Sequence, residues 1–72
     1  MEIKINGESR DVPDQVTIEE LVVLLGLKTD RLAVERNRSV VSRAQWSSVD
    51  LEDNDQIEII HFVGGGIFWR GE

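Results

Sequence analysis

The chain opens with an alternation of polar and apolar residues. Residues 2–5 alternate, Asn6-Gly7 follows, and residues 8–12 continue in an extended pattern. An Asn-Gly pair between two such runs is the strongest short-range signal of a β-hairpin, because both residues tolerate the positive φ of a type I′ turn. We therefore predict two antiparallel strands with Ile3 and Ile5 on one face, which another element must cover.

A helix that begins at Ile18 is the predicted cover. Thr17, followed three residues later by Glu20, has the form of a capping box, and Gly26 provides the left-handed residue that ends a helix. About two turns are too few for a helix that is stable without a sheet beneath it. Its apolar residues recur at the spacing of a buried stripe, with Val23 and Leu24 beside them: Ile18, Leu21, Val22 and Leu25.

The second half of the chain predicts further strands. A third strand is expected at residues 32–35, a short fourth at 40–41 and a last one at 56–63, with turns at 37–39, 43–46 and 52–55. Two strands, a helix and more strands in one short chain indicate an α+β fold, with one main helix packed across one face of a mixed sheet of four or five strands. Residues 1–63 then form a single domain, and residues 64–72 form a flexible arm and tail.

The last strand has two different faces. Ile57, Ile59 and His61 share one face, whereas Ile60 and Phe62 lie on the other. If Ile57 and Ile59 join the first hairpin beneath the helix, Ile60 and Phe62 are left on the open face beside the arm. We interpret them as a candidate docking patch; the alternative is that a loop covers them.

Composition limits the chemistry available to this domain. The chain has 72 residues, 8 of them basic and 14 acidic, and no cysteine. So short a chain buries a single small core and leaves no room for a deep cleft. Disulfides, thiolate nucleophiles and cysteine-ligated metals are excluded, and the one histidine, His61, makes no metal site by itself. We expect His61 to pack or to form a hydrogen bond, and Trp46 to close the edge of the core.

The charge of the chain bears on its partners. A net charge of −6 disfavours binding to nucleic acid or to anionic membranes. No apolar run spans a bilayer and the first residues lack the form of a signal peptide, so a cytoplasmic location is expected. Residues 50–58 carry five acids and no base. One hypothesis is that this stretch, Glu52 and Asp53 included, steers the chain toward a basic rim on a partner; the alternative is an ordinary solvated face.

The candidate chemistry lies after the last strand, where Gly64, Gly65 and Gly66 precede residues 67–72. Three glycines are unsuited to a strand, because each loses much backbone entropy on ordering and adds no packing. One interpretation is a flexible linker to a disordered tail. The other is an arm that threads into a partner, because a chain without Cβ atoms passes through a narrow channel and places a carboxylate in another protein's active site.

Residues 1–66 resemble the ThiS family, the small sulfur carrier proteins of thiamin biosynthesis, which have the ubiquitin-like β-grasp fold. The resemblance covers about nine tenths of the chain. The segment that carries it most specifically is residues 53–63, which lead into the glycines. Three weaker signals are the Asn6-Gly7 turn, the helix start at residues 17–21 and the strand end at residues 33–37.

The resemblance implies a function for the glycine arm. The carboxylate of Gly66 would be adenylated by an E1-like enzyme that uses ATP, converted to a thiocarboxylate by a sulfur donor system, and used by thiazole synthase. Gly64 and Gly65 would give passage through the partner's channel. The chain would then be a carrier and not an enzyme, with no cofactor of its own and with a monomeric free state.

The tail departs from the family pattern, because Gly66 is joined to Ile67 by a peptide bond. An amide cannot be adenylated as a carboxylate can, so we expect a processing protease to remove residues 67–72. Two alternatives stay open. The carrier could serve molybdopterin synthesis or tRNA thiolation, since the same arm suits all of these. The chain could also be a noncovalent ubiquitin-like binding module that keeps its tail as a recognition motif. An enzyme is disfavoured, because nothing in the sequence converges on a nucleophile and a base.

Overall fold

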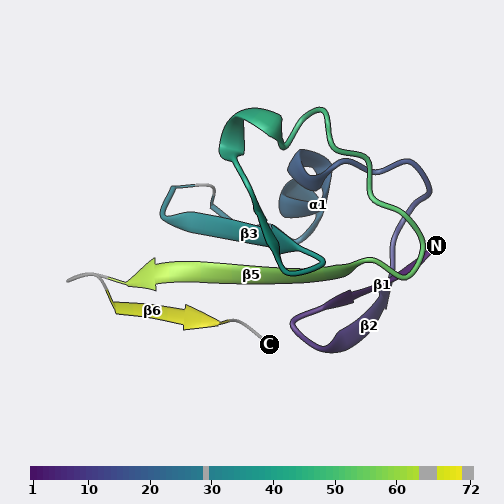
Figure 1. Ribbon diagram of the computed structural model, residues 1–72. Helices are drawn as coiled ribbons and strands as arrows, with labels where there is room; N and C mark the ends of the chain where they lie inside the picture. The colour runs from purple at the N-terminus through teal and green to yellow at the C-terminus, as the bar shows by residue number, and fades with distance from the viewer. Residues whose placement is uncertain (29, 64–66, 71–72) are drawn as a thin grey trace.

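The computed structural model describes residues 1–28, 30–63 and 67–70 (Figure 1). The predicted hairpin is present: β1 (Glu2–Ile5) pairs antiparallel with β2 (Glu8–Asp11), with Ile5 opposite Glu8. Asn6 and Gly7 between the strands have φ values of 51° and 87°. These positive angles match those of a type I′ turn, so the local Asn-Gly signal was sufficient to place the hairpin.

Helix α1 (Ile18–Leu24) begins where the capping signal predicted. The Glu20 backbone N–H donates to Thr17 Oγ1 at 3.1 Å, and the Thr17 backbone N–H donates to Glu20 Oε1 at 2.9 Å. Both bonds of the capping box are therefore formed. Gly26 has a φ of 70° just after the helix, the conformation in which glycine is favoured.

The remaining elements complete a mixed sheet. They are β3 (Leu32–Arg36), β4 (Ser39–Val41), the short 3₁₀ helix η1 (Arg43–Gln45), β5 (Gln56–Val63) and β6 (Ile67–Arg70). The strand order is β2-β1-β5-β3-β4, and β6 also pairs with β5. Strand β5 runs parallel to β1 and antiparallel to β3. In Figure 1, α1 and η1 lie on the same side of the sheet. The predicted α+β class is confirmed, and β6 is a strand that the sequence analysis did not predict.

The core fills the space between α1 and one face of the sheet. The sheet contributes Ile3, Ile5, Val34, Ile57 and Ile59, all of them buried. Trp46 is 3% exposed, and its Nε1–H donates to the Val41 carbonyl at 3.1 Å, so the expectation that it belongs to the core is confirmed. The core residues of the helix and of the loops are Val16, Ile18, Leu21, Val22 and Leu51. Of the four residues in the predicted helix stripe, Ile18, Leu21 and Val22 are buried as expected, whereas the fourth, Leu25, is only partly buried.

Asp55 joins the loop before β5 to the end of β3. Its carboxylate accepts hydrogen bonds from Arg36 Nε at 2.8 Å, from Asn37 Nδ2 at 3.1 Å and from the Glu52 backbone N–H at 2.8 Å. Burial alone would raise the pKa of Asp55, but these hydrogen bonds and the Arg36 charge together lower the pKa below its ordinary value of 3.8. Asp55 therefore fixes the start of β5 as an ionised, buried group.

Candidate functional site: the end of β5 and the glycine arm

The candidate arm begins where β5 ends. Val63 is the last residue of β5, and the predicted arm residues Gly64, Gly65 and Gly66 follow it directly in the sequence. These three glycines lie outside the described residues, so their role stays a prediction. The structure describes the strand on either side of them, β5 before and β6 after, and these strands pair antiparallel from Val63 opposite Ile67 to Ile60 opposite Arg70.

Strand β5 is firmly anchored in the fold. It lies at the centre of the sheet, and its pairing with β3 runs from Arg36 opposite Ile57 to Leu32 opposite His61. Close to the arm, the Phe62 backbone N–H still donates to the Arg31 carbonyl at 2.9 Å. Because Ile57 and Ile59 are 1% and 2% exposed in the core, β5 is held by packing against the helix side of the fold as well as by strand pairing. The candidate arm thus follows, in the sequence, a strand that is fixed in the sheet.

The candidate docking residues Ile60 and Phe62 lie on the face of the sheet away from the helix. This placement follows from the alternation of β5, whose residues Ile57 and Ile59 face the core. Phe62 is 45% exposed, whereas Ile60 is only 9% exposed. Phe62 therefore offers apolar surface beside the arm, and Ile60 offers little. Their role in docking stays a prediction.

The two acidic candidates differ in their surroundings. Glu52 is an exposed side chain whose carboxylate lies 3.5 Å from the Arg36 guanidinium. Asp53 is also exposed, but its Oδ1 accepts a hydrogen bond from the Glu2 backbone N–H at 2.9 Å, which ties the loop to β1. The acidic stretch is therefore not uniform, because Asp53 and the buried Asp55 have structural bonds. Glu52 is the better residue with which to test steering.

His61 lies near the arm on the helix side of β5, opposite Leu32. It is half-buried and, with Phe62, Lys28 and Arg31, it lines a shallow pocket of about 350 Å³ at this end of the sheet. The described lining holds no hydroxyl or thiol nucleophile that His61 could activate. The lining also holds two basic residues, Lys28 and Arg31, and one acid, Asp30, so this end of β5 is less acidic than the loop at its other end.

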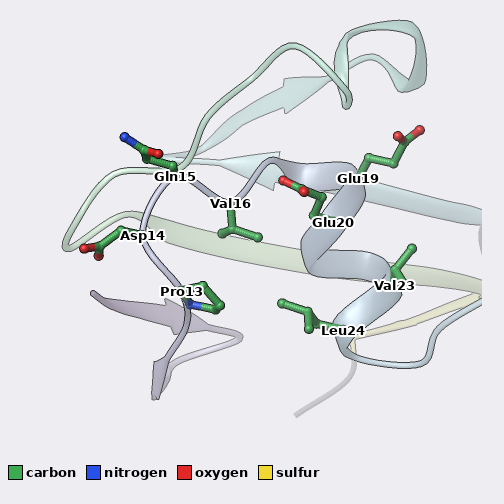
Figure 2. Close-up of a pocket in the computed structure, with 8 residues that line it drawn as sticks. All are labelled: Pro13, Asp14, Gln15, Val16, Glu19, Glu20, Val23 and Leu24. Atoms are coloured by element: carbon green, nitrogen blue, oxygen red, sulfur yellow. The ribbon is translucent and has the colours of Figure 1, made fainter.

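A second surface is an open groove of about 400 Å³ beside α1 (Figure 2). Apolar and acidic side chains line it together, but two of the acids have structural partners. Glu20 belongs to the capping box, and Asp14 Oδ1 lies 3.1 Å from the N-terminal ammonium. We assign no chemistry to this groove. Its lining comprises Pro13, Asp14, Gln15, Val16, Glu19, Glu20, Val23 and Leu24.

The described part of the chain lacks two further features. No group of three or more His, Cys, Asp or Glu residues there is arranged to hold a metal ion. No helix there is long and apolar enough to cross a membrane.

Sequence reasoning missed one contact at this site. The Asn6 side chain reaches β5, where its Oδ1 accepts a hydrogen bond from the Ile59 backbone N–H at 2.9 Å. Asn6 was interpreted only as a turn residue, and its turn position alone gave no signal of a bond to a residue 53 positions away. The hairpin turn therefore also serves the strand that carries the arm.

The fold and the position of the arm define a small domain of the ubiquitin-like β-grasp class, with three glycines following its central strand. Comparison with known proteins agrees with this class. The model of the ThiS family matches residues 3–66. The chain belongs to the ThiS family, and the resemblance seen in the sequence is confirmed.

Individual relatives support the same assignment. The sulfur carrier protein ThiS of Bacillus subtilis is 39% identical over 67 residues, which cover 89% of this chain and 98% of the relative. The crystal structure of the thiamine biosynthesis protein ThiS from Geobacter metallireducens superposes with a TM-score of 0.82 at 28% identity, covering 92% of this chain and all of that one. ThiS sulfur carrier proteins are not enzymes, which agrees with the expectation from the sequence.

A third relative is much longer. The thiazole synthase of Magnetococcus marinus is 46% identical over 66 residues, which cover 92% of this chain but 20% of the relative. This chain thus spans about one fifth of the length of that thiazole synthase. In that protein, a ThiS-like segment and the rest of a thiazole synthase are parts of a single chain.

Proposed function

We propose that this chain acts as a sulfur carrier in thiamin biosynthesis, with Gly66 as the residue that carries the sulfur. The observation that carries the proposal is the direct passage of the anchored central strand β5 into three glycines at the end of the family match, residues 3–66. A rigid domain presents the arm, and the absence of Cβ atoms lets the arm enter a narrow channel. Catalysis is left to the partners.

The proposed chemistry has two steps at the Gly66 carboxylate. A carboxylate oxygen attacks the α-phosphate of ATP on an E1-like enzyme, which gives the acyl adenylate and releases pyrophosphate. A sulfur nucleophile from the donor system then attacks the acyl carbon, and AMP leaves with the electron pair of the broken bond. If the nucleophile is a donor persulfide, this attack forms an acyl disulfide. A second thiolate of the donor system then attacks the donor-side sulfur, which breaks the S–S bond, forms a donor disulfide and releases the thiocarboxylate with the electron pair. ATP is a substrate of the enzyme in this scheme, so the carrier holds no cofactor.

The scheme requires a free carboxylate on Gly66, which is bonded to Ile67 in this sequence. We propose that a protease hydrolyses the Gly66–Ile67 bond and releases residues 67–72. Water supplies the hydroxyl that becomes part of the new carboxylate, and the amine of Ile67 is the leaving group. Processing therefore precedes adenylation in the proposed order. We propose the cytoplasm as the location of all these steps.

Thiazole synthase is the proposed acceptor of the sulfur. The Magnetococcus marinus relative supports this choice, because it joins a ThiS-like segment to a thiazole synthase in one chain. The surface proposed to dock on the partners is the open face around Phe62, with Ile60 beside it as a minor contributor. Glu52, with Asp53 as a neighbour that also ties the loop to β1, is proposed to steer the approach to a basic rim.

One observation favours a second candidate function, in which the tail is kept. Residues 67–70 form β6 and pair with β5. A tail that forms part of the sheet is what a noncovalent ubiquitin-like binding module keeps, whereas the carrier must lose it. A carrier that serves another sulfur-containing product would use the same arm and has no separate observation in its favour.

The test of the carrier proposal is ATP–pyrophosphate exchange with a ThiS-adenylating enzyme. We expect exchange with the chain that ends at Gly66 and none with the full chain, because only the former has the carboxylate at the end of the arm. A chain that ends at Gly65 is the matched control and should exchange more slowly, since its carboxylate reaches one residue less far. Equal exchange with the full chain, or none with the chain that ends at Gly66, would contradict the proposal.

A further inference from the structure

On the side of β5 that faces β1, the backbone groups of the strand have partners from three different parts of the chain. Strand β1 pairs with Gln56 and Ile57, and the Asn6 backbone N–H donates to the Ile57 carbonyl at 2.9 Å. The Asn6 side chain then accepts the Ile59 N–H. Beyond Ile59 the partner is β6, which pairs with residues 60–63. The tail therefore continues the line of β1 along the same edge of β5 (Figure 1).

The backbone groups that face β6 follow from the alternation of the strand. The Phe62 N–H donates to Arg31 on the β3 side. The N–H and C=O groups of neighbouring residues point to opposite sides of a strand, so His61 and Val63 direct theirs to the β6 side, as Ile59 does toward Asn6. His61 pairs with Trp69 in the observed register. The His61–Trp69 pair is thus expected to be a hydrogen-bonded pair of this ladder.

Removal of the tail would change this edge. After the cleavage proposed above, the backbone groups of His61 and Val63 on this side lose their strand partner, directly beside the arm. An edge with unpaired N–H and C=O groups is a template for an added strand. The residues that occupy it in this chain, Ile67–Arg70, are apolar and aromatic with a basic end, and they carry no acid. This composition indicates the kind of segment that the edge accepts.

We infer that residues 61–63 form a strand-accepting edge, which the tail covers in the precursor and which an extended segment of the adenylating partner covers after cleavage. The partner segment is antiparallel to β5, apolar or aromatic, and basic at one end. The inference rests on the proposed function, since it requires cleavage after Gly66. It differs from docking through Phe62, because it uses backbone groups at the strand edge and not the side chains of the open face.

The edge is tested with the tail as a separate peptide. We expect the acetylated peptide of residues 67–72 to bind the chain that ends at Gly66, and to shift the amide signals of His61 and Val63 in NMR spectra. N-methylation at Trp69 blocks the N–H that faces His61 and should weaken binding by about tenfold or more. N-methylation at Phe68, whose N–H points away from β5, is the matched control and should weaken binding far less.

Competition in the adenylation assay tests whether the adenylating enzyme binds this edge. The unmodified peptide should slow ATP–pyrophosphate exchange by competition with the enzyme for the carrier, and the peptide methylated at Trp69 should not. Absence of peptide binding, equal binding of the two methylated peptides, or binding that leaves exchange unchanged would each overturn the inference. Dimerisation of the chain that ends at Gly66 through residues 61–63 would do so as well, because a second copy would then be the occupant.

The two proposals fail in different ways in these experiments. If the chain that ends at Gly66 supports no exchange, the carrier function is wrong, and so is the adenylating enzyme as the occupant of the edge. Peptide binding would still show whether residues 61–63 accept a strand. If exchange occurs but the peptide neither binds nor competes, the carrier function stands and the strand-accepting edge is wrong.

Discussion

At the scale of single residues, Asp55 has the clearest energetic role. Among the side chains that the structure describes it is the one buried charge, and three donors hold its carboxylate. Asp55 connects the acidic loop before β5 to the end of β3 through these hydrogen bonds. The stability of the strand that carries the arm is thereby linked to an ionisable group.

We expect Asp55→Asn to cost about 1–3 kcal/mol of unfolding free energy at pH 7, because it removes charged hydrogen bonds in a buried site. The pKa of Asp55 is lowered in the folded state. Its stabilising contribution is therefore fully present above the ordinary pKa of 3.8 and is lost as the pH falls through the lowered pKa of the folded state. Urea unfolding at pH 7 and at pH 2 measures the effect.

The cost of Asp55→Asn should therefore be smaller at pH 2 than at pH 7. Asp50→Asn, at an exposed position in the same acidic stretch, is the control and should change stability little at either pH. An equal cost of Asp55→Asn at both pH values would show that the ionised carboxylate is not the stabilising species.

Asn6 is expected to stabilise β5 through its side chain, in addition to its place in the turn. Asn6→Gly keeps the positive φ but removes the acceptor for Ile59, so it should cost about 1 kcal/mol and speed hydrogen exchange of the Ile59 amide. Asn6→Asp keeps the acceptor for the Ile59 N–H but loses the donation from Nδ2 to the Ile59 carbonyl at 3.5 Å, so it should protect that amide more than Asn6→Gly does and less than Asn6 itself. Unchanged Ile59 exchange in Asn6→Gly would mean that the bond contributes nothing.

Substitution of Phe62 can distinguish a role in docking from a role in stability. Because the side chain is 45% exposed, Phe62→Ala should lower stability by no more than about 1 kcal/mol. The same variant should weaken binding to the adenylating enzyme by about tenfold, if Phe62 is an anchor of the docking face. Val40→Ala, also exposed on the open face but on β4, is the matched control and should bind normally. Calorimetric titration of both variants decides between a docking and a structural role.

At the scale of elements, the sequence predicted well what is determined locally. The hairpin turn at Asn6-Gly7, the capping box of α1 and the bounds of β5 all depend on residues within a few positions of one another, and the structure confirms them. Hydrophobic alternation also divided β5 into two faces, and the structure shows that the face with Ile57 and Ile59 is the buried one. Such signals need no knowledge of the rest of the chain.

Elements that depend on distant partners were harder to predict. Strand β6 follows three glycines, and its pairing exists only because β1 ends early and leaves an edge of β5 to be covered. Asp55 belonged to an acidic run that is typical of a solvated face, and only the fold brings Arg36 and Asn37 to it. At the candidate site, the sequence left open whether Ile60 and Phe62 are exposed or covered, and the structure gives a different answer for each: Phe62 is 45% exposed and Ile60 is 9% exposed.

At the scale of the whole molecule, charge is distributed unequally along β5. The loop before the strand is acidic, whereas two basic residues, Lys28 and Arg31, and one acid, Asp30, lie near its other end. A partner with a basic rim would orient the approaching chain by this asymmetry. Orientation by charge changes the association rate more than the lifetime of the complex.

We therefore expect Glu52→Lys to lower the association rate with the adenylating enzyme and to weaken its dependence on salt. Glu52 is exposed and makes only a long ion pair with Arg36, so stability should change by less than about 1 kcal/mol. Glu8→Lys changes the charge equally at an exposed position on β2 and serves as the control. Stopped-flow association at two salt concentrations gives both quantities. Equal rates for the two variants would rule out steering by Glu52.

The central claim concerns where the mature chain ends. The most direct measurement is the intact mass of the untagged protein isolated from its own cells during thiamin starvation. A carrier is predicted to end at Gly66, with a fraction of molecules in which sulfur replaces one oxygen of the terminal carboxylate. Recovery of only the full chain ending at Glu72 would contradict the carrier function and favour a binding module that keeps its tail.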